Sequence, residues 1–254
     1  MAGPPVLFRL PGLPPAVQGA YAAAADLCEV RTLPWEDATS ERPFAPAAEF
    51  ARVIDLRDFA FDPAFRGVAM IDFFLARLGL DPLRVPAALR RNAWLAPRLT
   101  PPPTARGYVL VCPRTSMALR DMPEALHADL LRWLATHTAR PVLTQGVSVA
   151  GTHPAPPAGD FAALCGLVAG AALVVSADTA MVHLADAYAV PTLALFTTHR
   201  PEWRVRDYPR CRALHFPAPG LPESLEFARS PADEAAAQAA WPGLEAIIQE
   251  IRLS

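Results

Sequence analysis

From Tyr108 onward, short apolar runs alternate with segments of helical periodicity, and this alternation is the strongest constraint on the fold. The runs expected to form strands are Tyr108–Cys112, Pro141–Thr144, Leu173–Ser176, Thr192–Phe196 and Arg212–Phe216. The segments expected to form helices are Pro123–His137, Asp160–Gly170, Asp178–Tyr188 and Asp233–Arg252. Strands that alternate with helices form βαβ units, and their parallel sheet carries helices on both faces. The sequence therefore predicts an α/β fold for this part.

The first hundred residues carry weaker signals of the same kind. The expected strands are Val6–Leu10, Cys28–Leu33 and Arg52–Leu56, and the expected helices are Ala16–Asp26 and Phe65–Leu80. A linker is expected at TPPPTAR, since three successive prolines can neither continue a helix nor join the interior of a sheet. We therefore predict two domains, residues 1–103 and residues 104–254.

The composition is that of a globular protein: 52% of the 254 residues are hydrophobic and 19% are charged. The uncharged run Phe161–Ala177 is too short and too weakly apolar to span a bilayer. The N-terminus has no basic region before an apolar stretch, which a secretion signal requires. We therefore expect no transmembrane segment and a cytoplasmic location.

The charged residues and the cysteines exclude further classes. A net charge of −2 lacks the basic footprint of a nucleic-acid-binding protein. All 23 basic residues are Arg, so an anion site must use guanidinium and backbone N–H groups. Cys28, Cys112, Cys165 and Cys211 have no CxxC spacing and adjoin apolar segments. Free thiols are therefore expected, with neither disulfides nor a metal site.

Two expected strand-to-helix loops carry polar residues, and ligands of parallel sheets bind beyond the carboxyl ends of the strands. The first loop, Cys112–Pro123, reads CPRTSMALRDMP and holds two hydroxyls and two Arg. The second reads SADTAMVH, and its Asp178 can cap the following helix. The N–H groups of Thr179, Ala180 and Met181 would then face a bound phosphate at the positive end of this helix.

Each of these residues also has a purely structural interpretation. An Asp at a helix N-cap is ordinary, so Asp178 can act as a cap alone. His183 fits a core histidine on an apolar helix face, and Arg114 and Arg120 fit solvated side chains. Spacing alone leaves both interpretations open.

The stretch VVSADTAMVHLADAYAVPTLALF resembles the signature D-[ST]-G-x-x-H-L-A-A-A-L-G-x-P-T-V-A-L-F-G of the heptosyltransferase-like glycosyltransferases, family 9. The loop CPRTSMALRDMP is similar to the P-G-A-x-x-x-x-K-x-W-P of that family. The resemblance covers Tyr108 to about Trp203 and is faint in the N-terminal part. It implies a GT-B-like architecture of two Rossmann-like α/β domains, with a parallel sheet in the C-terminal one and a cleft between them.

In this family the C-terminal domain holds a nucleotide-diphosphate sugar. The resemblance therefore implies substrate binding by Arg114, Thr115, Ser116, Arg120, Asp178, Thr179, Ala180, Met181 and His183. Arg120 stands where the family has Lys, and would neutralise charge on the departing nucleotide. Neither a metal ion nor another cofactor is expected.

The chain departs from the family at several places. Ala180 and Arg114 each replace a glycine, and Pro15 stands where the family has the Asp that deprotonates the acceptor. Asp55 and Asp58 are the nearest substitute carboxylates, although each also fits a capping or salt-bridging role.

Two functions follow from these observations. The first is a glycosyltransferase that moves a sugar from a nucleotide-diphosphate donor to a cell-envelope glycan or a lipid-linked acceptor. The alternative is a non-catalytic GT-B-like protein that binds a nucleotide sugar or a protein partner. The missing base and the short N-terminal part favour the alternative, whereas Arg120, Asp178 and His183 favour the enzyme.

Overall fold

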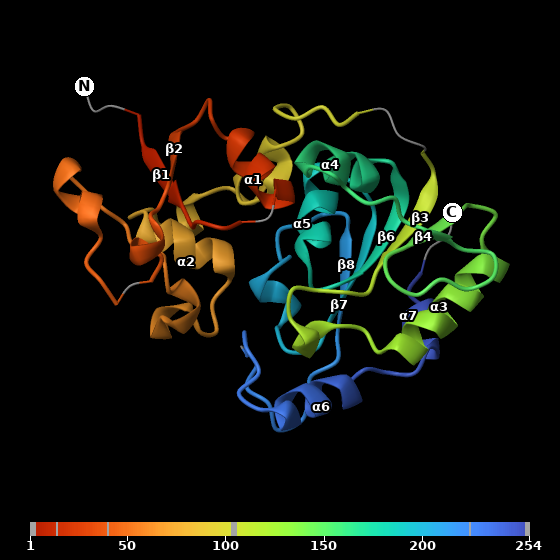
Figure 1. The fold of residues 1–254 in the computed structure, drawn as a ribbon. Helices are drawn as coiled ribbons and strands as arrows, with labels where there is room; N and C mark the ends of the chain where they lie inside the picture. Colours follow the sequence, from red (N-terminus) through yellow and green to blue (C-terminus); the bar gives the residue numbers. More distant parts are fainter. Residues whose placement is uncertain (1–3, 14, 40, 103–105, 224, 252–254) are drawn as a thin grey trace.

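The computed structural model describes residues 4–13, 15–39, 41–102, 106–223 and 225–251. Figure 1 shows a smaller N-terminal part, built around two strands, beside a larger C-terminal part, built around a six-stranded sheet. The predicted domain boundary between residues 103 and 104 lies outside the described residues. The same holds for Arg252, the last residue of the predicted terminal helix.

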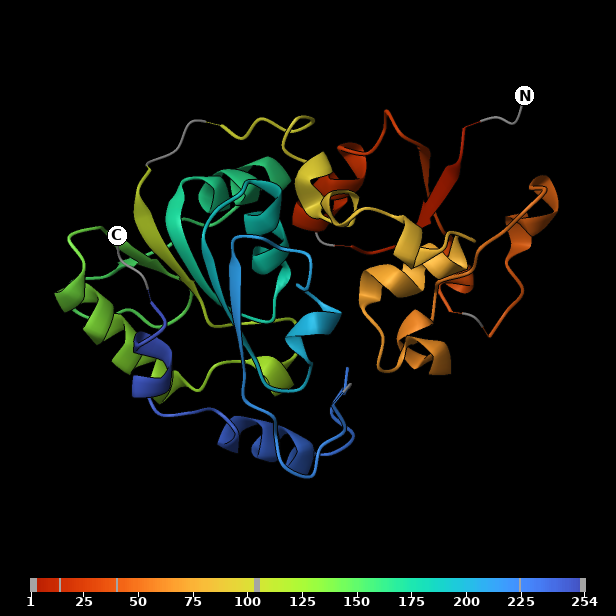
Figure 2. The same cartoon turned by 180° about the vertical axis from the view of Figure 1, so that it is seen from behind.

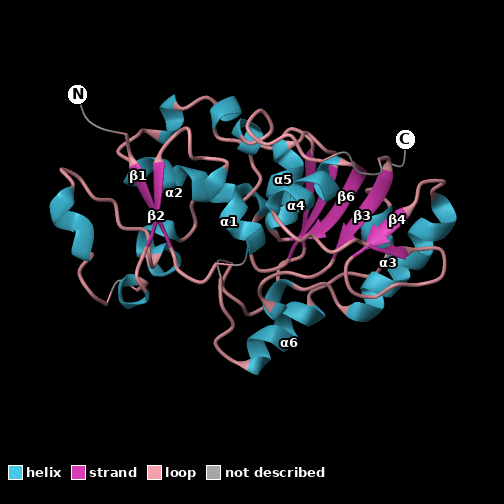
Figure 3. Cartoon of the chain, turned by 45° about the horizontal axis from the view of Figure 1, so that its top comes forward, coloured by secondary structure: helices cyan, strands magenta, loops and turns pink. Residues whose placement is uncertain are grey.

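The larger part confirms the predicted parallel α/β sheet. Its strand order is β5-β4-β3-β6-β7-β8, and all neighbouring pairs are parallel, as the arrows of β3, β4 and β6 in Figure 3 show. The strands are β3 (Tyr108–Cys112), β4 (Val142–Thr144), β5 (His153–Pro154), β6 (Ala171–Ala177), β7 (Thr192–Phe196) and β8 (Cys211–His215). The register pairs Cys112 with Ser176, so the loops after β3 and β6 begin side by side.

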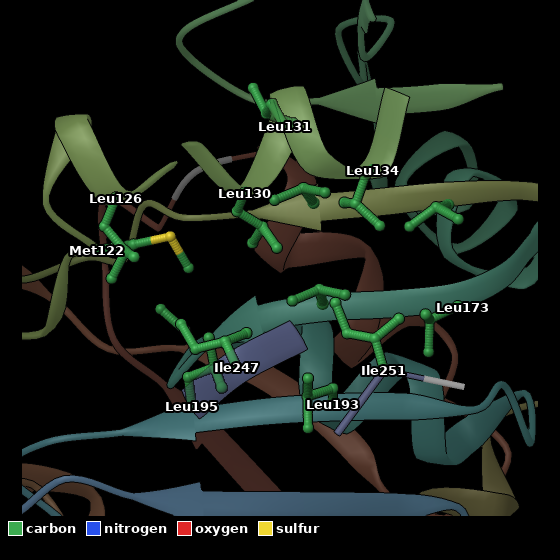
Figure 4. Close-up of a cluster of buried hydrophobic side chains, with 14 of the residues drawn as sticks. Met122, Leu126, Leu130, Leu131, Leu134, Leu173, Leu193, Leu195, Ile247 and Ile251 are labelled. Atoms are coloured by element: carbon green, nitrogen blue, oxygen red, sulfur yellow. The ribbon is translucent and has the colours of Figure 1, made fainter. Parts of the chain in front are cut away.

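Helices cover both faces of this sheet because successive residues of a strand point to opposite faces. The helices are α3 (Glu124–His137), α4 (Phe161–Ala169), α5 (Ala180–Ala187), α6 (Pro231–Ala239) and α7 (Glu245–Ile248). On one face Val109 and Val111 join a cluster with α3 and α7, which is drawn in Figure 4. On the other face Leu110 and Cys112 join a cluster with α4 and α5.

The prediction of one long terminal helix, Asp233–Arg252, is wrong, because this segment is not a single continuous helix. The chain instead forms α6 and α7, which are separated by the segment Ala240–Leu244. Pro242 and Gly243 account for the break, because Pro lacks a donor and clashes with the preceding turn, and Gly is a poor helix former. Figure 2 shows α7 beside α3. The buried side chains of Ile247 and Ile251 complete the core there, as Figure 4 shows.

The smaller part contains a two-stranded parallel sheet of β1 (Val6–Arg9) and β2 (Glu29–Thr32), with α1 (Pro15–Ala22) and α2 (Met70–Arg77). Its short 3-10 helices are Trp35–Asp37, Ala45–Glu49, Phe59–Phe61, Pro63–Phe65, Pro82–Arg84, Ala87–Leu89 and Asn92–Trp94. The larger part has two more, Ala118–Arg120 and Pro201–Trp203. Among the described residues, no helix has the length and apolarity needed to cross a bilayer.

The predicted strand Arg52–Leu56 is also wrong, since this segment joins no sheet. Directly after it, the backbone N–H of Arg57 donates to Asp55 Oδ1 at 3.0 Å. The Arg57 guanidinium donates to the carbonyl oxygens of Asp37 and Arg42. These bonds tie the segment to the preceding loop rather than to β1 or β2.

The two parts meet through two kinds of contact. At α1, Gly19 lies so close to α4 that an added Cβ would come within 2.3 Å of Phe161 Cβ. At α2, Asp72 forms an ion pair with Arg206, with Oδ2 and Nη1 separated by 2.8 Å. The contact at α1 is therefore apolar and close, whereas the contact at α2 is ionic.

The packing of α7 yields a test of the fold. Ile247→Ala should lower the free energy of unfolding by about 2–5 kcal/mol, because it leaves a cavity in the core between α3 and the sheet. Leu83→Ala is the control: Leu83 is 92% exposed, and its truncation should change stability by less than about 0.5 kcal/mol. Urea unfolding followed by circular dichroism measures both. Equal stability of the two variants would contradict the docking of α7.

Candidate functional site

The two loops that follow β3 and β6 line one cavity of about 340 Å³. It is lined by Phe59, Met70, Arg114, Thr115, Ser116, Arg120, Asp178, Thr179, Ala180, His183, Arg204 and Glu226. All residues predicted to bind substrate are among them except Met181. Phe59 and Met70 come from the N-terminal part, so the cavity lies between the two parts of the chain.

The beginning of α5 differs from the expected geometry in one respect. The N-cap is Thr179, whose Oγ1 accepts the N–H of Met181 at 3.0 Å. Asp178 is therefore not the cap, because its carboxylate faces the side chains of His199 and Arg120 instead. The N–H of Met181 is already bonded, and this leaves the exposed Ala180, the first helical residue, to offer an N–H without an acceptor in its own helix.

Asp178 is buried and has a histidine and an arginine as partners. His199 Nδ1 lies 2.8 Å from Asp178 Oδ2, and Arg120 Nε lies 3.7 Å from the same oxygen. Burial alone would raise the pKa of Asp178. The hydrogen bond from His199 and the charges of His199, Arg120 and Arg204 outweigh burial and lower the pKa to about 2. Asp178 is therefore a fixed negative charge at physiological pH.

Glu226 brings a second carboxylate to the same group from the loop between β8 and α6. Its Oε1 lies 3.2 Å from His199 Nε2, and its Oε2 lies 3.7 Å from Arg120 Nη1. Arg204 also forms an ion pair with Glu226. Burial would raise the pKa of Glu226, but the bond from His199 and the nearby Arg204 lower it. Arg120 and Arg204, two of the three arginines that line the cavity, are thus both paired with the carboxylate of Glu226.

Asp121 holds the loop after β3 in place. It accepts the backbone N–H of Thr115 at 2.6 Å and pairs with Arg114 at 3.1 Å. The side chain of Arg114 remains 56% exposed, whereas that of Arg120 is only 13% exposed. Arg120 Nη2 donates to Ser116 Oγ at 3.4 Å. The side chain of Arg120 is therefore fixed in the cavity wall by its contacts and is not a solvated loop side chain.

A second cavity, of about 470 Å³, adjoins the first. It is lined by Ala69, Met70, Ile71, Phe74, Leu89, Arg90, Arg91, Asn92, Trp94, His183, Glu202, Trp203, Arg204, Arg206, Asp207 and Tyr208. His183, Arg204 and Met70 belong to both linings. The second cavity therefore continues the first and combines aromatic and apolar side chains with a charged rim.

The carboxylates of the two linings differ in their partners. Asp178 and Glu226 are paired as described, and Asp207 pairs with Arg90 and Arg206. Glu202 is exposed, and among the described residues no Arg or His nitrogen forms a close ion pair with it, although its charge acts on Arg200 and His215. Glu202 is therefore the carboxylate of these linings that is open to a further interaction.

Asp55 and Asp58 are not among the lining residues of either cavity. Asp55 is exposed and bonded to Arg57, with Oδ2 and Nη2 separated by 2.6 Å. The hydrogen bonds from Arg57 lower the pKa of Asp55, against a smaller effect of burial. The four cysteines are free thiols, as expected. Within the residues that the structure describes, no group of three or more His, Cys, Asp or Glu side chains is arranged to hold a metal ion.

Sequence reasoning missed His199, Arg204 and Glu226. His199 and Arg204 follow β7, which pairs with β6. Because ligands of parallel sheets bind beyond the carboxyl ends of the strands, the loop after β7 could also have been expected at the site. No comparable signal marks Glu226, which lies in an irregular segment far along the chain.

The site can be compared with known proteins. The model of glycosyltransferase family 9 (heptosyltransferase) matches residues 87–208. E. coli heptosyltransferase WaaC with ADP-2-deoxy-2-fluoro heptose is 18% identical, with a TM-score of 0.43; the alignment covers 70% of this chain and 53% of that chain. The chain thus spans about half the length of WaaC. A comparison with curated proteins found no match.

The iron-containing dodecameric glycosyltransferase TibC from enterotoxigenic E. coli is 15% identical, with a TM-score of 0.56, and the alignment covers 97% of this chain and 78% of that chain. TibC in complex with ADP-D-beta-D-heptose gives 15% identity and a TM-score of 0.52, over 97% and 76%. The match over residues 87–208 includes both loops of the cavity and the parallel strands before them. Residues 87–208 thus match a glycosyltransferase family 9 (heptosyltransferase) domain, and the chain has the α/β fold of the TibC glycosyltransferase structures.

Proposed function

We propose that this protein is a glycosyltransferase that transfers a sugar from a nucleotide-diphosphate donor to a hydroxyl group of a cell-envelope glycan or lipid-linked acceptor. One observation carries the proposal: the residues that resemble the donor site of the family, except Met181, line a single cavity between the two parts of the chain. The complex of TibC with ADP-D-beta-D-heptose makes ADP-linked heptose the first donor to test.

In the proposed mechanism the acceptor hydroxyl displaces the diphosphate directly at the anomeric carbon. Negative charge then develops on the leaving diphosphate, and groups that are already in place stabilise it best. Arg120, Arg204 and the N–H of Ala180 face the same cavity and can supply this stabilisation.

The second cavity is the proposed acceptor side, and the N-terminal part, residues 1–103, contributes to it through α2 and the segment Leu89–Trp94. The acceptor hydroxyl needs a base, and Pro15 stands where the family carries one. Glu202 is the carboxylate of this lining without a close ionic partner among the described residues, so we propose that it takes the proton.

Incubation with ADP-heptose and a cell-envelope extract separates this enzyme from the non-catalytic alternative. The enzyme releases ADP faster when the extract is present and labels a component of it with heptose. A protein that binds ADP-heptose without releasing ADP or labelling the extract belongs to the alternative class.

The exposed end of α5 gives the first test of donor binding. Ala180→Leu should lower the affinity for ADP by at least about tenfold, or about 1.4 kcal/mol, because its side chain blocks the approach to the backbone N–H. Ala180→Gly should bind ADP at least as well as the parent, since it opens this approach further. Titration calorimetry measures the affinities, and circular dichroism checks the fold. Unchanged binding by Ala180→Leu would place the ligand elsewhere.

The charge balance of the cavity gives a second test. Glu226→Gln should tighten ADP binding by roughly tenfold, about 1.4 kcal/mol, because the neutral amide no longer competes with phosphate for Arg120 and Arg204. Glu223→Gln is the matched control: Glu223 lies on the same loop and pairs with the exposed Arg200. Weaker binding by Glu226→Gln would instead show that the carboxylate holds the guanidinium groups in place for the ligand.

The proposed base gives a third test. Glu202→Gln should lower the transfer rate by about a hundredfold or more while leaving ADP affinity unchanged, as expected for a group that acts in the chemical step. Glu223→Gln again serves as the control and should retain the parent rate. Full transfer activity in Glu202→Gln would exclude Glu202 as the base.

A further inference from the structure

His183 stands in the wall shared by the two cavities, and its ring nitrogens have different surroundings. Nδ1 lies 2.7 Å from the hydroxyl oxygen of Tyr208. Among the described residues, no hydrogen bond reaches Nε2. Burial lowers the pKa of His183, and the opposing charges of Asp178 and Arg204 have smaller effects, so the ring is neutral near pH 7. The ring therefore carries one proton, on either Nδ1 or Nε2.

The partners of Tyr208 decide which nitrogen carries that proton. The Asn92 amide nitrogen Nδ2 lies 2.6 Å from the Tyr208 hydroxyl and can only donate, so the hydroxyl oxygen accepts this bond. Burial raises the pKa of Tyr208, which keeps the phenol protonated. Its single hydrogen has one acceptor in the described part of the chain, His183 Nδ1. Nδ1 is therefore an acceptor, and the proton of the neutral ring is on Nε2.

Asn92 is itself held by the helix that carries His183. Its backbone N–H donates to Asp186 Oδ2 at 2.9 Å, and the neighbouring Arg91 Nε donates to Oδ1 at 3.0 Å. Asp186 is buried and lies three residues after His183 on α5. The chain of bonds from Asp186 through Asn92 and Tyr208 thus returns to the same helix, which fixes the orientation of the imidazole ring.

We propose that Asn92 and Tyr208 are positioning residues that hold His183 as the neutral Nε2–H tautomer, a hydrogen-bond donor to an oxygen of the bound nucleotide diphosphate. This inference rests on the proposed function for the identity of the ligand. The tautomer itself is a property of the free protein. His183 then offers a donor without adding a full positive charge beside Arg120 and Arg204, whose charges Asp178 and Glu226 already balance.

Nitrogen NMR of protein labelled with 15N-histidine tests the tautomer directly, because protonated and unprotonated ring nitrogens resonate at well-separated frequencies. His183→Gln identifies the His183 signals by their disappearance. In the parent protein we expect an unprotonated Nδ1 and a protonated Nε2. In Tyr208→Phe we expect a shift of both signals toward a mixture of the two tautomers. Tyr188→Phe is the matched control, since its hydroxyl donates to the Leu99 carbonyl away from both cavities.

ADP titration supplies the functional measurement. Tyr208→Phe should weaken ADP binding by about three- to tenfold, the effect of one hydrogen bond, while Tyr188→Phe should bind as the parent does. If Tyr208→Phe does not fold, Asn92→Ala removes the donor to Tyr208 but retains the backbone bond to Asp186, and the same spectral change is expected.

Two results would overturn the proposal. One is a parent spectrum with the His183 proton on Nδ1. The other is a Tyr208→Phe variant whose His183 signals and ADP affinity equal those of the parent. Failure of the parent to bind any nucleotide diphosphate would instead count against the proposed function, and the nitrogen spectra would still decide whether Tyr208 and Asn92 set the tautomer.

Discussion

The register between β3 and β6 is the constraint on which the site depends. Cys112 lies opposite Ser176, so the loops that follow leave the sheet at the same level. A strand rises about 3.3 Å per residue, and a slip of two residues would separate the loops by about 7 Å. Arg120 and Asp178, which come from these two loops, could then no longer form their ion pair. Buried apolar side chains on both faces of the strands hold the register in place.

Charge compensation is the second principle of the site. Buried ions are costly unless they are paired, and here two carboxylates lie close to two guanidinium groups and His199 in a protein without Lys. A diphosphate that enters this group must exchange partners with Glu226 rather than fill an empty positive pocket. The binding free energy of the proposed donor would then be the difference between the interactions of the diphosphate and of Glu226 with the same guanidinium groups. Ligands that make contacts beyond those of their charge would therefore bind best.

Local patterns allowed the parallel sheet and most of the cavity lining to be predicted from the sequence. Apolar runs and helix periodicity mark β3, β6, β7 and α5, and the topology of parallel sheets brings their loops together. Details that depend on tertiary partners were not accessible. Thr179 caps α5 because Asp178 has partners from distant loops, and Glu226 reaches the site from an irregular segment. The break at Pro242 was readable in principle, since proline interrupts a helix whatever surrounds it.

The contacts between the two parts of the chain have a consequence for the medium in which the protein works. At α1 the close apolar contact of Gly19 with Phe161 does not depend on salt. At α2 the pair of Asp72 and Arg206 is partly exposed, and dissolved ions screen such pairs over about 8 Å at physiological ionic strength. Dissolved salt therefore weakens the ion pair at α2 and leaves the contact at α1 unchanged. The pair of Arg91 with the buried Asp186 and the hydrogen bond between Asn92 and Tyr208 also join the two parts, so the parts stay together when the exposed pair is screened.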